Sequence, residues 1–446
     1  MNLPAPSLSY VLSNRLPVKA FLIWFVYVAA LLLWHSYKFR FAHSNKLDWL
    51  TRSVNSDLVP TILSGFYFSL QSIPLLGDST YLIQIWQKQL NIIWASEPIS
   101  HFLLTKTFSP FMLSKIIPPV MGAVSMWLWL KLPVTAVTLR MSQNNESSLT
   151  ILFRILFFAS APVQMIFYRG YFETLMIFIP FSLLYIYFLL KFVISNEAKP
   201  VALFMVVVVT LGIAISVHGV AFVWLPILPI LLQRFGLRPF VSFRLYGFVF
   251  AIIFPVFIYG IILVLFSVVG YKIDLLNMGG GGDGSAFVSI YGLTEWANYS
   301  LYWFGSIQHI WSVVSILVYS ALYLVVLTIF YFLNDRPRFN LSKDTAVRFL
   351  LFGGFLGFIV FWNFDLGFFY DFDLIFSLSL SVGLVAELMV QNYKKTQYTS
   401  KNQKVENIET NELSSNYNQL LKPSLFFIVI AVIQTSLWLT AFSRFF

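Results

Sequence analysis

The sequence predicts an all-α membrane protein with about eleven transmembrane helices. Of its 446 residues, 58% are hydrophobic and only 11% are charged, whereas a soluble protein of this length carries about 25% charged residues. Apolar runs of about 20 residues recur along the whole chain, and each is long enough to span a hydrocarbon core of about 30 Å. These runs do not alternate apolar and polar residues, as the strands of an outer-membrane barrel do.

The apolar runs give the order of the predicted spans. The first run follows Arg15 and Lys19 and has no clear small-residue cleavage site, so we interpret it as an uncleaved span rather than a signal peptide. One long apolar stretch is divided into two spans by a turn at His218. The predicted spans cover 18–35, 110–130, 148–167, 171–193, 200–216, 217–233, 245–269, 307–333, 345–362, 371–391 and 424–443.

Two polar regions interrupt this series and divide the chain into its predicted parts. Residues 36–109 form a long first external loop within a multi-span domain, 1–391. In this loop, apolar residues of 79–94, STYLIQIWQKQLNIIW, recur at intervals of three and four, which predicts one amphipathic helix in the membrane interface. Residues 392–422 are polar with few aromatic residues, which predicts a flexible cytoplasmic linker before the last span, 424–443.

The basic residues predict the orientation in a plasma (inner) membrane. With the N-terminus in the cytoplasm, 19 of the 29 Lys and Arg residues lie on the inner side. Eleven spans then place the C-terminus outside. We attribute the net charge of +10 to this cytoplasmic bias rather than to nucleic-acid binding. The absence of cysteine excludes disulfides and thiolate metal sites.

Polar residues that a lipid-embedded bundle does not need cluster on the predicted outer side. They include Asp78, Glu97, Arg169, Glu173, His218, His309 and Asp373. Each has a structural explanation as well: Asp78 as a helix cap, Arg169 with Glu173 as a pair four residues apart, and the histidines as packed side chains. Their location on one predicted side of the membrane is the observation that indicates a functional site. We expect one outward-facing cavity to be surrounded by Asp78, Glu97, Arg169, His218 and His309.

Three carboxylates lie in the apolar stretch FWNFDLGFFYDFDLIF, residues 361–376. A carboxylate at the bilayer centre costs about 2.5–3.5 kcal/mol, so we expect this stretch to be an external turn. Asp371 and Asp373 are two residues apart and diverge by about 200° on a helix. We therefore expect Asp371 to cap the following span and Asp373 to reach inward to a cationic group or a sugar hydroxyl.

Three short segments of the external loops resemble those of a group of prokaryotic membrane proteins within the GT-C class of glycosyltransferases. LLGDST at 75–80 is similar to an LGDG-like first loop, NYSLYWFGSIQH at 298–309 to a YxLFS…H stretch, and YDFDLIF at 370–376 to a DWDLF-like turn. Ser79 replaces a Gly and Phe372 replaces a Trp. The first loop lacks a paired Asp motif, so no metal ligand is assigned and a divalent metal stays open.

The resemblance implies an enzyme of the cell envelope that moves a sugar from a polyprenyl-phosphate donor to an acceptor on the outer face. It implies Asp78 as the general base, with Glu97 as a partner acid or sugar ligand. Arg169 would bind the donor phosphate, and His218 and His309 phosphate or sugar hydroxyls. Glu173 and Asp373 complete the expected substrate-binding set.

Two other functions remain open from the sequence. A flippase or transporter of lipid-linked sugars would need acids near the midplane and interrupted helices in paired halves, and no internal repeat is present. A non-catalytic scaffold subunit of an envelope complex is also compatible with the sequence, since a fold is retained when activity is lost.

Overall fold

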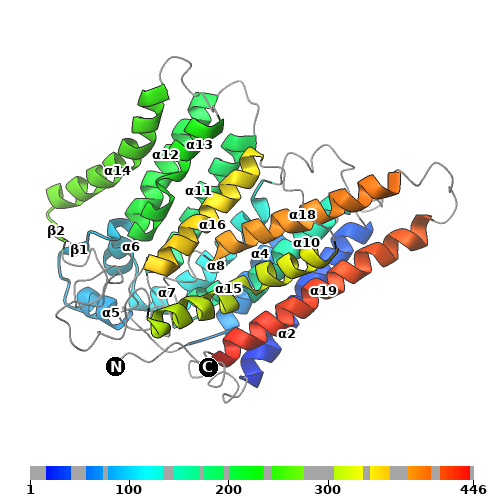
Figure 1. Ribbon diagram of the computed structural model, residues 1–446. Helices are drawn as coiled ribbons and strands as arrows, with labels where there is room; N and C mark the ends of the chain where they lie inside the picture. The colour runs from blue at the N-terminus through cyan, green and yellow to red at the C-terminus, as the bar shows by residue number, and fades with distance from the viewer. Residues whose placement is uncertain are drawn as a thin grey trace.

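The computed structural model describes residues 17–41, 57–73, 79–133, 145–170, 174–194, 200–235, 244–275, 306–334, 342–361, 379–402 and 412–441. These residues form a bundle of helices with a two-stranded sheet at one end (Figure 1). Helices occupy all or part of each of the eleven predicted spans.

The helices in chain order are α2 (Val18–Phe41), α4 (Leu58–Leu70), α5 (Ser79–Gln87), α6 (Pro98–Phe102), α7 (Pro110–Lys115), α8 (Ile117–Lys131), α10 (Asn145–Ser160), α11 (Thr174–Ile194), α12 (Pro200–Val217), α13 (Ile227–Phe235), α14 (Arg244–Val268), α15 (Ile307–Asn334), α16 (Lys343–Phe361), α18 (Leu380–Asn402) and α19 (Glu412–Ala441). A π-helical turn, η1 (Leu103–Thr107), and two 3-10 turns, η2 (Pro162–Phe167) and η3 (Gly219–Trp224), lie between them. The strands are β1 (Ile92–Trp94) and β2 (Lys272–Asp274).

Length and composition support the prediction of an all-α membrane protein. Within the described ranges, five helical segments are long and apolar enough to cross a membrane, and a sixth is added if the two bent halves of α15 count as one. Five further apolar helices are shorter, with 10–17 residues. The number eleven and the GT-C arrangement stay predictions.

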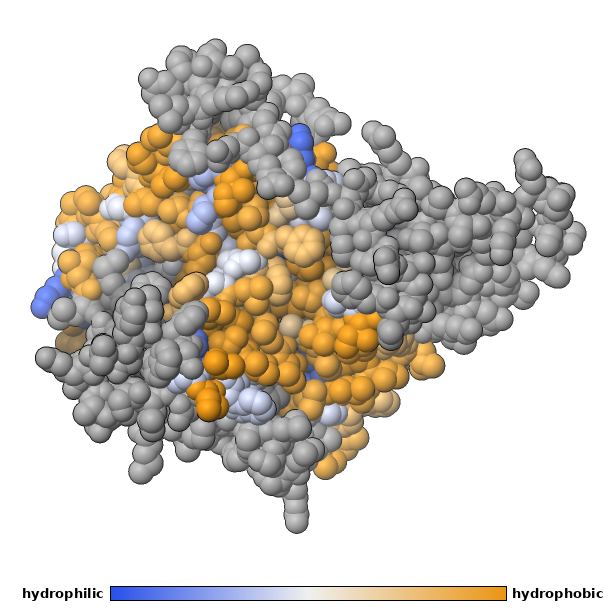
Figure 2. Space-filling view, in the orientation of Figure 1, coloured by the Kyte–Doolittle hydropathy of each residue, from blue (hydrophilic) through white to orange (hydrophobic). Residues whose placement is uncertain are grey.

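Apolar side chains cover much of the outer surface of the described helices. The space-filling view shows them as broad orange areas (Figure 2). On α14 the exposed side chains are almost all aliphatic or aromatic, with Ile253 59% and Val268 78% exposed. Since water does not favour such a surface, lipid is the solvent that it fits.

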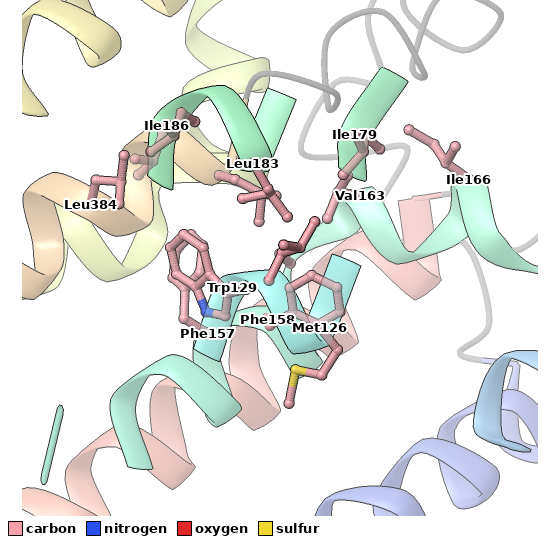
Figure 3. Close-up of a cluster of buried hydrophobic side chains, with 14 of the residues drawn as sticks. Met126, Trp129, Phe157, Phe158, Val163, Ile166, Ile179, Leu183, Ile186 and Leu384 are labelled. Carbon is pink, nitrogen blue, oxygen red and sulfur yellow. The ribbon is translucent and has the colours of Figure 1, made fainter. Parts of the chain in front are cut away.

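A packed core of large side chains joins the helices in the middle of the bundle. Met126 and Trp129 of α8 meet Phe157 and Phe158 of α10 and Leu183 of α11 in the cluster that Figure 3 shows. The indole N–H in this cluster donates to a main-chain carbonyl, that of Arg154, at 2.9 Å. This buried donor therefore has a hydrogen-bond partner, as buried polar groups require.

Buried charges tie three helices together at one end of the bundle. Glu387 of α18 accepts two hydrogen bonds of 2.9 Å from Arg154 of α10, and its Oε1 lies 3.4 Å from Nη1 of Arg348 of α16. All three residues are at most 1% exposed. Two arginines around one carboxylate form a connected network rather than an isolated charge, which is how a buried ion is tolerated.

The structure adds a helix, α4, that the sequence analysis left inside the first external loop. Before its first residue, Asp57 forms ion pairs with Lys38 of α2 at 3.2 Å and Lys131 of α8 at 2.6 Å. After its last residue, Gln71 donates to the carbonyl of Ala20, at the other end of α2, at 3.0 Å. Helix α4 therefore runs from one end of the bundle to the other.

We call the end that carries Lys38, Asp57 and Lys131 the basic end, and the end that carries β1, β2 and α6 the sheet end. The first turns of α2 and the last turns of α19 both lie at the sheet end. Trp24 of α2 donates to the carbonyl of Ala159, and Trp438 of α19 donates to that of Ser160 at 2.9 Å. The start of α2 and the end of α19 therefore lie at the same end of the bundle. Which side of a membrane each terminus occupies stays a prediction.

One further expectation about local structure is corrected, and two helices extend into the predicted linker. Residues 79–94 are not one helix: α5 ends at Gln87, Gln89 takes a positive φ of 50°, and β1 follows, in parallel register with β2. The β-branched and aromatic residues Ile92, Ile93 and Trp94 favour the strand. In the predicted linker, α18 continues to residue 402 and α19 begins at residue 412.

Candidate functional site

The segment that follows β1 positions a carboxylate, that of Glu97, at the sheet end. The N–H of Ala95 donates to the carbonyl of Asp274 at 3.0 Å, which extends the sheet by one residue. The hydroxyl of Tyr259 on α14 donates to the carbonyl of Ala95 at 2.6 Å. Pro98 then begins α6, in the first turn, where a missing N–H costs nothing.

The same segment is tied to the carboxyl end of α12. Ser100 donates to the carbonyl of Val217 at 2.7 Å, and the N–H of Gly219 donates to the carbonyl of Ser96 at 2.7 Å. A Cβ atom at position 219 would lie 3.1 Å from that same carbonyl oxygen, so the close approach favours glycine. These two hydrogen bonds hold together segments that are more than 100 residues apart in the sequence.

This attachment brings Glu97 and His218 into direct contact. Oε2 of Glu97 lies 3.1 Å from Nε2 of His218, and their side chains are 6% and 13% exposed. The other ring nitrogen, Nδ1, accepts the N–H of Val220 at 3.1 Å. Because an acceptor nitrogen carries no proton in the neutral ring, Nε2 carries it and donates to the carboxylate.

Burial supports the neutral form of this histidine. Removal from water lowers the pKa of His218 to about 3, since the low-polarity surroundings disfavour the imidazolium. Both of its nitrogens are engaged within the protein. In this geometry His218 holds Glu97 in place, and its expected role toward phosphate or sugar stays a prediction.

A second histidine, His101, lies one helical turn after Glu97 on α6. It is fully buried, its ring lies 4.6 Å from that of Trp94, and neither ring nitrogen has a hydrogen-bond partner among the residues that the structure describes. Burial, with a smaller contribution from Lys106, lowers its pKa to about 3. Sequence reasoning did not select His101, although its spacing of four residues from Glu97 was the available signal.

Arg169 lies at the same end in a short connection between η2 and α11. Its main chain forms a bridge with Ser72: its N–H donates to the carbonyl of Gln71 at 3.2 Å, and its carbonyl accepts from Ile73 at 2.9 Å. Within the described ranges, Nε of its guanidinium is buried without a hydrogen-bond partner. No contact in the described part of the chain joins Arg169 to Glu97.

His309 connects two helices, and its expected role toward phosphate or sugar stays a prediction. Its Nε2 lies 2.8 Å from the carbonyl of Val360, so it donates there and connects the start of α15 to the end of α16. It is 2% exposed. This contact explains His309 as a link between two helices, and no hydrogen bond or ion pair described in the structure joins it to Glu97 or Arg169.

Three of the predicted site residues, Asp78, Glu173 and Asp373, lie outside the described residues. Among the residues that the structure does describe, no group of three His, Asp or Glu side chains is arranged to hold a metal ion. The described site therefore consists of the Glu97–His218 pair with His101 beside it and Arg169 at the same end.

Comparison with family models and with curated proteins gave no match for this chain.

Proposed function

We propose that the protein is an integral membrane glycosyltransferase that moves a sugar from a polyprenyl-phosphate donor to an acceptor hydroxyl. The observation that carries this proposal is the Glu97–His218 contact, which fixes a carboxylate of the first external loop against the end of a membrane helix. A buried carboxylate held by a neutral histidine is suited to receive a proton or to orient a hydroxyl.

The proposed chemistry assigns one task to each group. The bond between the anomeric carbon and the phosphate oxygen breaks, and a bond from that carbon to the acceptor oxygen forms. A carboxylate, Asp78 or Glu97, takes the acceptor proton, while His218 acts as a positioning residue for Glu97. Arg169 would neutralise the phosphate that leaves with the polyprenyl chain.

We also propose that the sheet end faces the exterior and the basic end the cytoplasm. With α4 counted as a crossing, Arg15 and Lys19 leave the cytoplasmic set, and four residues join it: Lys38, Arg40, Lys46 and Arg52. The cytoplasmic share thus rises from 19 to 21 of the 29 basic residues. The excess of Lys and Arg on one side is the pattern of cytoplasmic loops.

The test uses purified protein in nanodiscs with a panel of short-chain polyprenyl-phosphate hexoses and pentoses. We expect consumption of at least one donor and a fall of about 100-fold or more in rate for Glu97→Gln. Asp57→Asn makes the same acid-to-amide change at the opposite end and should leave the rate near that of the unmodified protein. Equal rates for Glu97→Gln and the unmodified protein would remove Glu97 from the mechanism.

The transporter alternative gives a different result in the same material. A flippase would move a fluorescent lipid-linked sugar across a proteoliposome membrane without forming a new glycosidic bond. A scaffold would do neither. Product analysis and translocation, measured together, therefore separate the three functions.

A further inference from the structure

The lipid-facing side of α4 is much shorter than a membrane is thick. Its exposed apolar side chains recur every four residues, at Leu58, Ile62, Phe66 and Leu70, which are 46–62% exposed. At a rise of 1.5 Å per residue, this stripe is about 18 Å long, and tilt can only shorten its span along the membrane normal. The hydrocarbon core of a typical bilayer measures about 30 Å.

Polar groups border the stripe at both ends. At the basic end, Asp57 is held between Lys38 and Lys131, and the Lys131 side chain is 47% exposed. At the sheet end, the side chain of Gln71 donates to a main-chain carbonyl of α2. Ser72 forms the main-chain bridge with Arg169, whose N–H donates to the carbonyl of Gln71. Neither end leaves room for the apolar stripe to continue along this helix.

Another edge of the same molecule has the ordinary thickness. Helix α14 exposes apolar side chains from Val249 to Val268, a distance of about 28 Å along the helix. A bilayer that matches α14 is about 10 Å too thick for α4. A short apolar segment is accommodated when the bilayer thins around it.

We propose that α4 thins the bilayer locally and thereby lowers the lipid headgroups to the level of Arg169. The occupant of this surface is bilayer lipid, and the charged group brought to Arg169 is a lipid phosphate. Main-chain bonds hold Arg169 beside the residues that follow α4, at the end of the stripe, and Nε of its side chain is buried without a hydrogen-bond partner among the described residues. The phosphate part rests on the proposed function, whereas the thinning does not.

The chain has no cysteine, so single cysteines can carry nitroxide labels without background. The probes are Leu58→Cys, Ile62→Cys and Leu70→Cys on α4, with Val249→Cys and Val268→Cys on α14 as the matched control. Label depth is measured by collision with oxygen and with a neutral nickel complex, in nanodiscs of di-18:1 phosphatidylcholine. We expect shallow labels at 58 and 70, a deep label at 62, and shallow labels at both α14 positions.

Without thinning, at least one of the two α4 end labels would lie about 6 Å or more below the headgroups, and this result would overturn the proposal. Labels at 58 and 62 shielded from both oxygen and nickel would show that a second copy covers α4, which also overturns it.

The phosphate part is tested separately with polyprenyl monophosphate as the probe. Arg169→Gln should leave the label depths unchanged and weaken retention of the probe about tenfold or more. Unchanged retention would overturn the assignment to Arg169 while the depth result stands. Because neither measurement needs sugar transfer, failure of the proposed enzyme activity is distinguishable from failure of this inference.

Discussion

Glu97, the residue before α6, and His101 within it lie one helical turn apart, yet their side chains have different surroundings. The carboxylate is paired with the Nε2–H of His218 at 3.1 Å, whereas the imidazole of His101 packs on Trp94 with both nitrogens without a partner. An unsatisfied buried polar atom costs about 1–3 kcal/mol. His101 therefore lowers the stability of the folded state, and its protonation would lower that stability further.

The unfavourable protonation of buried histidines predicts that the folded protein becomes less stable at low pH. The pKa of both His101 and His218 is lowered to about 3 in the folded protein, against about 6.5 when unfolded. Between these values the unfolded chain binds the additional protons, so stability falls as pH falls from 6.5 toward 3, by about 1.4 kcal/mol per pH unit for each histidine. Thermal unfolding in detergent should show a lower midpoint at pH 5 than at pH 7.

His101→Phe identifies one source of this effect. Phenylalanine has a ring of similar size, does not titrate and leaves no polar atom unsatisfied, so the variant should lose less stability between pH 7 and pH 5. A loss equal to that of the unmodified protein would show that His101 does not contribute.

Sequence reasoning selected Glu97 and His218 separately, and the structure places them in contact. Their common outer side was predictable from span ends, but the contact depends on Gly219 and Ser100, whose roles become visible only when α6 meets α12. Arg169 and His309 share the sheet end but have separate contacts. The hydrophobic pattern of the sequence predicts on which side of the membrane a residue lies, whereas the distance between two residues depends on how the helices pack.

At the scale of elements, the Arg154–Glu387–Arg348 network fixes how α10, α16 and α18 meet. Gln391, one turn along α18, also donates to Oε1 of Glu387 at 2.9 Å. The arginines also donate to main-chain carbonyls just after the end of α8: Arg154 to that of Leu132 at 2.6 Å, and Arg348 to that of Pro133 at 3.1 Å. Parts of four helices are therefore connected through one carboxylate and its two arginines.

Glu387→Gln should be strongly destabilising. It leaves two buried guanidinium groups without their negative partner, a change that typically costs about 3–5 kcal/mol. Unfolding in a mixed-micelle titration should show this loss. Asp57→Asn alters a partly exposed ion pair and should change stability by about 1 kcal/mol or less. Similar losses for the two variants would contradict a stabilising role for the network.

The elements that the sequence did not predict have identifiable reasons. Helix α4 has 13 residues, fewer than the about 20 that define a span, so its apolar pattern was assigned to a loop. Strand β1 exists through pairing with β2, which lies about 180 residues later in the chain. Helical spacing over 79–94 could not reveal that partner, and the tertiary pairing overrode it.

At the scale of the whole molecule, the ends of the described chain meet on one helix. The indoles of Trp24 and Trp438 donate to consecutive carbonyls, those of Ala159 and Ser160, at the end of α10. Helix ends have four carbonyls without partners in the helix, and these side chains satisfy two of them. Both terminal helices consequently start or finish at the sheet end.

Epitope tags at the two termini should therefore be accessible from the same side of the membrane. We expect protease to remove both tags in right-side-out vesicles and neither in inverted vesicles. A tag inserted between residues 403 and 411 should behave in the opposite way, because α18 and α19 join at the basic end. Terminal tags on opposite sides would show that α4 does not cross the membrane.

The closure of α10 by Trp438 also sets an order for biosynthesis. The carbonyl of Ser160 and the indole that reaches it are separated by 278 residues. At about 5–20 residues per second, the ribosome adds that length in roughly 15 to 55 s. Throughout that interval α10 stands in the membrane without the last helix that covers its carboxyl end. The nascent bundle is then open to lipid and to quality-control proteases until α19 has been made and packs against α10.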